Sequence, residues 1–157
     1  MKICVVGGTG NISSGIVNVL IEHNHEVVCF NRGIRDRLPD GVRLIKGDRL
    51  DSKDFEDKMK SENFDAVIDM LCFNAQQAKS SIRAFKKVKH FVMCSTVGTY
   101  GNKYNLFPTN ENHPIRPADG YSHNKAEADA VFMDAYEKNN FPVTIIKSST
   151  VYGPKGG

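Results

Sequence analysis

The sequence predicts an α/β protein built on a doubly wound, six-stranded parallel sheet, and two observations support this fold class. Short apolar segments alternate along the chain with segments in which apolar residues recur at helical spacing. The apolar segments, among them ICVV, VVCF and FVMC, lack two-residue alternation, as expected of parallel strands that helices cover on both faces. We therefore expect the strand order 3-2-1-4-5-6 with helices on both faces of the sheet.

The expected strands span residues 2–6, 26–30, 42–46, 66–70, 90–94 and 143–147. The third, VRLIK, mixes charged with apolar residues and is typical of an edge strand. The expected helices span residues 12–23, 52–61, 75–87 and 121–139. In the first helix Ile12, Ile16 and Leu20 recur every four residues, and Asn24 suits a left-handed C-cap. Residues 98–120, which contain three prolines and no periodicity, predict a long functional loop.

Length and composition limit the class of protein. A chain of 157 residues suits one domain, and 40% hydrophobic with 25% charged residues is ordinary for a globular protein. A net charge of +3 is too small to indicate nucleic-acid binding. The four cysteines are widely spaced without a C-x-x-C motif, so we expect buried thiols and no metal site. No segment resembles a signal peptide or a membrane span, so we expect a cytoplasmic protein.

The stretch VVGGTGNISSG indicates a phosphate-binding turn between the first strand and the first helix. Gly7 allows the tight turn, and Gly10 lets backbone amides approach a pyrophosphate at the helix N-terminus. Ser13 stands where a third glycine usually allows close packing of helix and strand, and we expect the helix to tolerate it with a slight outward shift. The alternative is a glycine-rich turn without a ligand. We assign to cofactor binding the turn residues Gly7, Thr9, Gly10, Asn11 and Ile12.

Residues after the second and third strands would contact the adenosine half of a dinucleotide. Asn31 can hydrogen-bond a ribose hydroxyl without repelling a 2′-phosphate, and Arg32 could pair with that phosphate. This pair favours NADP slightly over NAD, the alternative being that Arg32 is a solvated loop arginine. Asp48 in GDRL could reach the adenine, and we add Leu71 to the cofactor-binding residues.

A second set of polar residues follows the fifth strand. CSTVGTYG contains several hydroxyl groups, and PADGYSHNK places Tyr121 and Lys125 four residues apart, so that both project from one helix face. A Y-x-x-x-K pair occurs often by chance, and the alternative is an ordinary helix tyrosine with a solvated lysine neighbour. Here the pair opens a helix downstream of a phosphate turn.

Together these motifs resemble the extended short-chain dehydrogenase/reductases, in particular the NAD(P)-dependent sugar-nucleotide epimerase/dehydratase family. The resemblance covers the whole chain through GGTGNIS, CSTVGTYG, ENHPIRPADGYSHNK and VYGP. It implies a Rossmann NAD(P)-binding domain over residues 1–157, an epimerase or reductase acting on a sugar nucleotide, and a homodimer formed through helices 75–87 and 121–139. Family members continue into a carboxy-terminal substrate domain, so we expect a cofactor-binding domain that is inactive by itself.

The resemblance also implies roles for three residues. Aligning the family's Tyr-Gly pair on Tyr100 and Gly101 makes Thr96 the catalytic hydroxyl that positions the substrate, with Ser95 as the alternative. Tyr121 would be the general acid/base. Lys125 would favour the phenolate and hold the nicotinamide ribose. A free tyrosine has a pKa near 10, so we expect Lys125 and the positive nicotinamide ring to lower it.

Two departures from the family pattern limit the activity that we expect. Dehydratases of the family carry an Asp-Glu pair after the catalytic threonine, where this chain has Val97 and Gly98. Neither residue can transfer a proton, so dehydratase activity is disfavoured. GNIS and CFNRG are more similar to a divergent branch that includes chloroplast proteins associated with RNA. A non-catalytic dinucleotide-binding or RNA-associated module of the same fold is therefore the alternative function.

Overall fold

The computed structural model describes residues 1–34, 38–103 and 107–153; Arg35, Arg37 and Pro154 lie outside this part. Its strands are β1 (Lys2–Val6), β2 (Glu26–Asn31), β3 (Arg43–Lys46), β4 (Ala66–Asp69), β5 (His90–Thr96) and β6 (Val143–Ser148). They form one sheet in the order β3-β2-β1-β4-β5-β6, and every neighbouring pair is parallel. The predicted topology and the edge position of β3 are confirmed.

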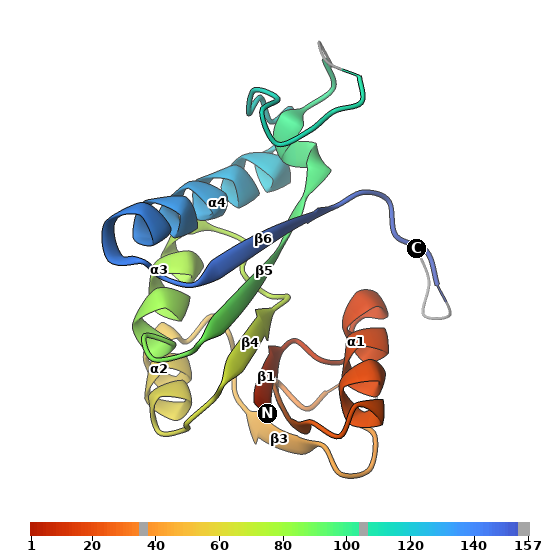
Figure 1. Cartoon of the computed structure of the whole chain (residues 1–157), viewed down its shortest axis with the longest axis vertical. Coiled ribbons are helices and arrows are strands. Elements are labelled where there is room, and N and C mark those ends of the chain that lie inside the picture. The colour runs from red at the N-terminus through yellow and green to blue at the C-terminus, as the bar shows by residue number, and fades with distance from the viewer. Residues whose placement is uncertain (35–37, 104–106, 154–157) are drawn as a thin grey trace.

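Helices lie on both faces of the sheet, as expected, but unequally. The helices are α1 (Asn11–Glu22), α2 (Ser52–Lys60), α3 (Ala75–Ala84) and α4 (Gly120–Asn139), with a short 3₁₀ helix η1 (Val97–Tyr100) after β5. Figure 1 shows α1 alone on one side of the sheet and α2, α3 and α4 together on the other. The molecule is therefore a three-layer structure with one thin outer layer.

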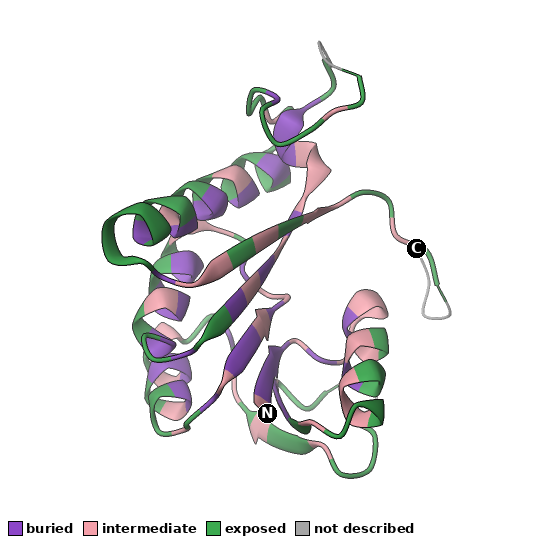
Figure 2. Ribbon diagram, in the orientation of Figure 1, coloured by how far each residue is buried: buried purple, intermediate pink, exposed green. Residues whose placement is uncertain are grey.

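The hydrophobic core is divided by the sheet in the same unequal way. The larger cluster lies under α2, α3 and α4 and contains a chain of aromatic contacts through Phe30, Phe55, Phe85, Phe91 and Phe132. The smaller cluster lies under α1 and has four buried members: Val5, Val17, Val27 and Cys29. Figure 2 shows the buried residues concentrated in the strands and on the inner sides of the helices.

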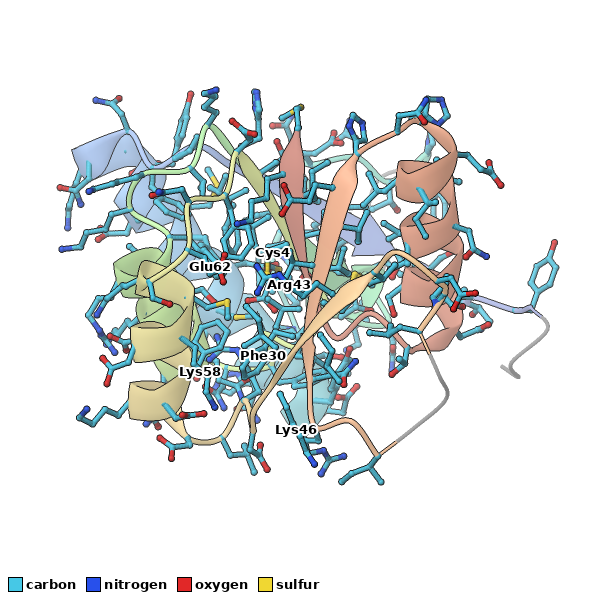
Figure 3. The ribbon with its side chains drawn as sticks, turned by 90° about the horizontal axis from the view of Figure 1, so that it is seen from below. Cys4, Phe30, Arg43, Lys46, Lys58 and Glu62 are labelled. Atoms are coloured by element: carbon cyan, nitrogen blue, oxygen red, sulfur yellow. The ribbon has the colours of Figure 1, made fainter. Side chains whose placement is uncertain are left out.

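Ion pairs tie the edge strand β3 to the rest of the molecule. Glu62 accepts hydrogen bonds from Lys2 at 2.7 Å and from Arg43 at 2.8 Å, which links β1 and β3 to the segment after α2 (Figure 3). Lys58 of α2 donates to the carbonyl of Lys46 at the end of β3. These contacts hold the loop after β3 in place although its strand is short and exposed.

Helix α1 buries a different stripe from the one expected. Ser13 and Val17 are its buried residues, whereas Ile12, Ile16 and Leu20 are only partly buried. The reason is that the helix approaches the sheet closely at its first turn, where the small side chain of Ser13 faces the strand. The predicted left-handed residue after this helix is confirmed, because Asn24 has φ 58°.

Helix α3 ends at Ala84, three residues earlier than expected. Phe85 leaves helical geometry and is buried in the larger core, in contact with Phe55 and Phe91. The lysines that follow are therefore loop residues. Three helices begin at side-chain caps: Asp51, Asn74 and Asp119 each accept a hydrogen bond from the backbone N–H three residues later.

Residues 101–119 carry no helix or strand where the structure describes them. The expected long loop is thus present, preceded by η1. Gly101 is needed at its start, since φ is +76° and a Cβ atom would lie 1.9 Å from the Arg116 carbonyl oxygen. No helix within the described ranges is long and apolar enough to cross a membrane.

Candidate functional site

The phosphate turn has the geometry that its glycines predict. Gly7 has φ +90°, and a Cβ atom on it would lie 2.6 Å from Cγ of Leu71. Its N–H donates to the carbonyl of Phe30, which fixes the turn against β2. Helix α1 then starts at Asn11, so that its unpaired first-turn N–H groups lie at the end of β1.

Ser13 completes the turn instead of disturbing it. Its hydroxyl accepts a hydrogen bond from the N–H of Gly10 at 2.8 Å and donates to the carbonyl of Gly7. The side chain is 1% exposed, so the serine occupies the space between helix and strand. The hydroxyl thus makes two hydrogen bonds across the turn at the place where a third glycine usually stands.

A cavity of about 400 Å³ opens beside this turn. The carboxyl ends of β1, β2, β3 and β4 surround it, which is the edge where parallel α/β sheets bind ligands. Seven of the predicted cofactor-binding residues line it: Gly7, Thr9, Gly10, Asn31, Arg32, Asp48 and Leu71. Asn11 and Ile12 are not among its lining residues, although both belong to the first turn of α1.

The polar residues that we expected to select the cofactor differ in how they are held. Asn31 accepts a hydrogen bond from the N–H of Gly33 through Oδ1 at 2.8 Å. Asp48 accepts one from the N–H of Leu50 at 2.9 Å. Arg32 is exposed at the cavity wall. The first two side chains thus brace their own loops, and Arg32 remains accessible to an anionic ligand.

The cavity also contains a buried arginine that the sequence analysis did not single out. Arg49 is 5% exposed and its guanidinium lies over the ring of Phe55, with Cζ 3.9 Å from the ring centroid. Its Nη2 donates to the carbonyl of Gln77 and to Oγ of Ser81, and lies 3.7 Å from Oδ2 of Asp69. The sequence offered one indication that Arg49 belongs to this site: it directly follows Asp48, which we expected to contact the adenine.

Thr96 and Ser95 lie at the end of β5 in different environments. Thr96 is partly buried and caps η1, with its Oγ1 accepting from the N–H of Gly98 at 3.1 Å. Ser95 is 2% exposed and donates to a carboxylate oxygen of Asp129. Only Thr96 therefore has its hydroxyl near the surface of the sheet's carboxyl edge, which supports its choice over Ser95.

Tyr121 and Lys125 stand one turn apart at the start of α4, as the spacing predicts. Tyr121 is 54% exposed and its ring centroid lies 6.4 Å from that of Phe73. Lys125 is 2% exposed, and its ammonium group donates to the carbonyls of Cys72, three residues after β4, and of Cys94 in β5. Burial lowers the pKa of Lys125 below its usual value.

The surroundings of Tyr121 within the chain itself disfavour the phenolate. Its pKa is raised above 10, first because burial disfavours the phenolate and then because of the nearby Cys94 and Asp119. The ammonium group of Lys125 is directed to two carbonyl oxygens. In this arrangement the lysine joins the backbone at Cys72 to the backbone at Cys94.

A partly buried ion pair connects the elements that carry these residues. Lys147 of β6 pairs with Asp129 of α4 and donates to Oγ1 of Thr99 at 2.7 Å, while Thr99 donates to the carbonyl of Thr96 at 3.0 Å. The network connects the helix that carries Tyr121 with the strand end that carries Thr96. Asp129 follows Lys125 by four residues, so the helical spacing could have identified it.

Phe73 joins the two halves of the site. It lines the cavity beside the phosphate turn, contacts Tyr121, and lies under the ammonium group of Lys125, which is 5.3 Å from its ring centroid. The cavity and the Thr96–Tyr121–Lys125 cluster are therefore adjacent along the carboxyl edge of one sheet. Among the described residues, no three His, Cys, Asp or Glu side chains gather in a way that could hold a metal ion.

Comparison with known sequences agrees with this geometry. The sequence model of the NAD dependent epimerase/dehydratase family matches residues 3–157. A 2′-dehydrokanamycin reductase from Streptomyces kanamyceticus is 28% identical over 97% of this chain and 43% of its own length. A UDP-glucose 4-epimerase from Corynebacterium glutamicum is 27% identical over 99% of this chain and 53% of its own. The chain thus spans about half the length of these curated relatives.

Solved structures share the fold at lower identity. A UDP-glucose 4-epimerase from Thermotoga maritima, determined with UDP-glucose, superimposes with a TM-score of 0.84 at 23% identity, covering 99% of this chain and 57% of that one. A dTDP-glucose 4,6-dehydratase from Bacillus anthracis, in complex with NAD, gives a TM-score of 0.82 at 21% identity with the same coverage.

Proposed function

The chain belongs to the NAD dependent epimerase/dehydratase family, and on this basis we propose that it binds NAD or NADP in the cavity at the carboxyl edge of β1–β4. We further propose that the natural protein containing these residues is an epimerase or reductase that acts on a sugar nucleotide. One observation carries the proposal: the phosphate turn and the Thr96–Tyr121–Lys125 cluster lie side by side at this edge, joined by Phe73.

The residues at hand fit a dinucleotide. The first-turn N–H groups of α1 would face its pyrophosphate, and Gly7, Thr9 and Gly10 leave room for it at the cavity wall. Asp48 and Leu71 line the adenosine side. When bound, the cofactor supplies the hydride acceptor or donor of the reaction.

The proton that accompanies hydride transfer would be handled by this chain. The Tyr121 hydroxyl, half exposed at the start of α4, would take the proton from a sugar hydroxyl during oxidation and return it during reduction. Thr96 would orient that hydroxyl through Oγ1. Lys125, held by the carbonyls of Cys72 and Cys94, would contact the nicotinamide ribose.

Water elimination is disfavoured by the geometry as well as by the residue types. Gly98 stands where dehydratases carry an acidic residue, and a Cβ atom there would lie 2.6 Å from Oγ of Ser122. An acidic side chain at this position would require the Ser122 hydroxyl, which donates to Asp119, to move. We therefore propose epimerase or reductase activity and do not propose dehydratase activity.

The first experiment measures binding by the chain itself. Calorimetric titration with NAD and with NADP should show saturable, one-to-one binding. Turnover of nucleotide sugars is then assayed in the natural protein that contains these residues. Tyr121→Phe should lower turnover about 10²–10⁴-fold, because the proton shuttle is lost, and should leave cofactor affinity almost unchanged.

Tyr136→Phe is the matched control, because Tyr136 lies on the same helix and is 52% exposed, close to the 54% of Tyr121. It should leave turnover unchanged. A Tyr121→Phe protein that keeps more than about a tenth of the original turnover would argue for a non-catalytic dinucleotide-binding or RNA-associated module.

A further inference from the structure

Thr99 connects the ion pair of the site to the backbone of Thr96. Its side chain lies in η1 and is fully buried. Its Oγ1 is 2.7 Å from the ammonium nitrogen of Lys147 and 3.0 Å from the carbonyl oxygen of Thr96. An ammonium group can only donate hydrogen bonds, so Thr99 accepts there and its own proton is left for the carbonyl. The hydrogen bonds therefore run in one direction, from Lys147 through Thr99 to Thr96.

Contacts with three elements hold the ammonium group of Lys147 in place. Asp129 of α4 supplies the carboxylate that pairs with it. The same carboxylate oxygen accepts a hydrogen bond of 3.0 Å from Ser95 of β5. The ammonium nitrogen also lies over the ring of Tyr100 in η1, 5.0 Å from its centroid. Moving the ammonium group away would leave a mostly buried carboxylate unpaired, so Lys147 is a fixed donor for Thr99.

The hydroxyl of Thr96 has one hydrogen-bonding function left for a ligand. Its Oγ1 accepts from the N–H of Gly98 at 3.1 Å. In the described part of the chain its proton has no acceptor, so it can donate to a substrate oxygen. Rotation about ψ of Thr96 would break both the bond from Gly98 and the bond that Thr99 donates to the carbonyl. The two hydrogen bonds together therefore fix where this hydroxyl lies at the end of β5.

We propose that Thr99 and Lys147 are positioning residues, which hold the Thr96 hydroxyl where it donates to an oxygen of the substrate. The proposal rests on the function proposed above and adds the residues on which the role of Thr96 depends. Neither positioning residue lines the cavity beside the phosphate turn, so neither should contribute to cofactor affinity. A displacement of about 1 Å at a reacting group can lower a rate on the order of 100-fold. Loss of the bond from Thr99 should therefore lower kcat and leave cofactor binding unchanged.

Thr99→Val and Thr99→Ser give the first comparison, in the natural protein that contains these residues, with UDP-glucose and dTDP-glucose as substrates. Valine has nearly the shape of threonine but no hydroxyl, so it removes both hydrogen bonds, whereas serine keeps the hydroxyl and loses the methyl group. Thr99→Val should lower kcat about tenfold or more and leave the Kd of NAD within about twofold. Thr99→Ser should keep kcat within about threefold, because packing alone is not what Thr99 supplies.

A double variant separates the position of the ammonium group from the balance of charge. Lys147→Met alone leaves the carboxylate of Asp129 unpaired and should lower both kcat and the urea midpoint. Adding Asp129→Asn removes that charge and keeps an acceptor for Ser95. The urea midpoint should then recover while kcat stays low, because Thr99 still lacks its donor.

Lys2→Met is the matched control. The Lys2 side chain is 25% exposed against 19% for Lys147, pairs with Glu62 at 2.7 Å, and lies over an aromatic ring, that of Phe64. It stands at the start of β1, at the opposite edge of the sheet. Lys2→Met should therefore leave kcat unchanged.

A measurement on the 157-residue chain tests the positioning without turnover. The amide hydrogen of Gly98, which is bonded to Oγ1 of Thr96, should exchange with solvent faster in Thr99→Val than in Thr99→Ser. Equal exchange in the two variants, an unchanged kcat in Thr99→Val, or a kcat that recovers together with the urea midpoint in the double variant overturns the positioning role while the proposed function stands. Turnover that survives Tyr121→Phe, or an unaltered protein that turns over neither nucleotide sugar, contradicts the proposed function itself.

Discussion

At the scale of single residues, Ser13 shows how a departure from a motif can be structural. It bridges Gly10 and Gly7 through its hydroxyl. Ser13→Gly would restore the usual glycine but remove both hydrogen bonds and add helix-interior flexibility. We expect the free energy of unfolding to fall by about 1.5–2.5 kcal/mol, measured by urea denaturation.

Ser14→Gly is the control for this substitution. Ser14 is the next residue of α1, and among the described residues its hydroxyl donates one long hydrogen bond, 3.3 Å, to the carbonyl of Asn11. Ser14→Gly should lower the free energy of unfolding by about 0.5–1 kcal/mol, which is the cost of placing glycine in a helix. Equal losses for the two variants would show that the Ser13 bridge contributes nothing.

Arg32 is the residue that would choose between the two cofactors. Exposed at the cavity wall, it could pair with a 2′-phosphate and contribute on the order of 1–2 kcal/mol, a roughly tenfold preference for NADP. Arg32→Ala should remove this preference and leave NAD affinity unchanged, as calorimetry with both cofactors would show. Arg116→Ala, at an exposed arginine outside the cavity, should change neither. A preference that survives Arg32→Ala refutes the assignment.

At the scale of elements, one ion pair joins two helices of the thick layer. Glu56 of α2 accepts two-pronged hydrogen bonds from Arg83 of α3, at 2.7 and 3.1 Å to Oε1, and pairs with Lys60. Arg83 holds the pKa of Glu56 at about 2, below its ordinary 4.5. Because the folded pKa is depressed, the contribution to stability is present above pH 4.5 and is lost as the pH falls toward 2.

Glu56→Gln should therefore lower the free energy of unfolding at pH 7 by about 1–2 kcal/mol, a modest value because Arg83 is half exposed. It should also flatten the decline in stability between pH 4.5 and 2, followed by urea denaturation at each pH. Glu22→Gln, at the exposed end of α1, should leave both quantities unchanged. An unaltered pH profile in Glu56→Gln would contradict the role of the pair.

The strands and their order were predictable because each strand is a compact apolar run whose signal is local. The ends of the elements were less predictable. Helix α3 ends at Ala84 because Phe85 packs into a core formed by residues distant in the sequence. At the site, the phosphate turn and the Tyr121–Lys125 spacing could be found from the sequence. The burial of Arg49 could not, since its partners Asp69 and Ser81 are 20 and 32 positions further along the chain.

At the scale of the whole molecule, we expect a homodimer. Helices α3 and α4 pack side by side, and a groove of about 450 Å³ between them is lined by Ile82, Ala130 and Val131 among others. Ala130 is exposed in the single chain, so Ala130→Arg should disrupt pairing without unfolding the monomer. Sedimentation velocity should show a dimer for the original chain and a monomer for the variant.

Asn18→Arg, at an exposed position of α1 on the opposite side of the sheet, is the control and should remain a dimer. An original chain that sediments only as a monomer at high concentration would refute the dimer. A dimer that persists in Ala130→Arg would place the interface elsewhere.

The unequal division of the core has a consequence for motion. The cluster beneath α1 has four buried members in the described part of the chain, of which Val17 alone belongs to the helix, whereas an extended aromatic cluster lies beneath the other three helices. Local opening of α1 should therefore cost less free energy than opening of the thick layer. The phosphate turn leads into α1, so a dinucleotide that binds the turn would stabilise the packing of α1 on the sheet by mass action. Cofactor binding and the closing of α1 would then be a single coupled equilibrium.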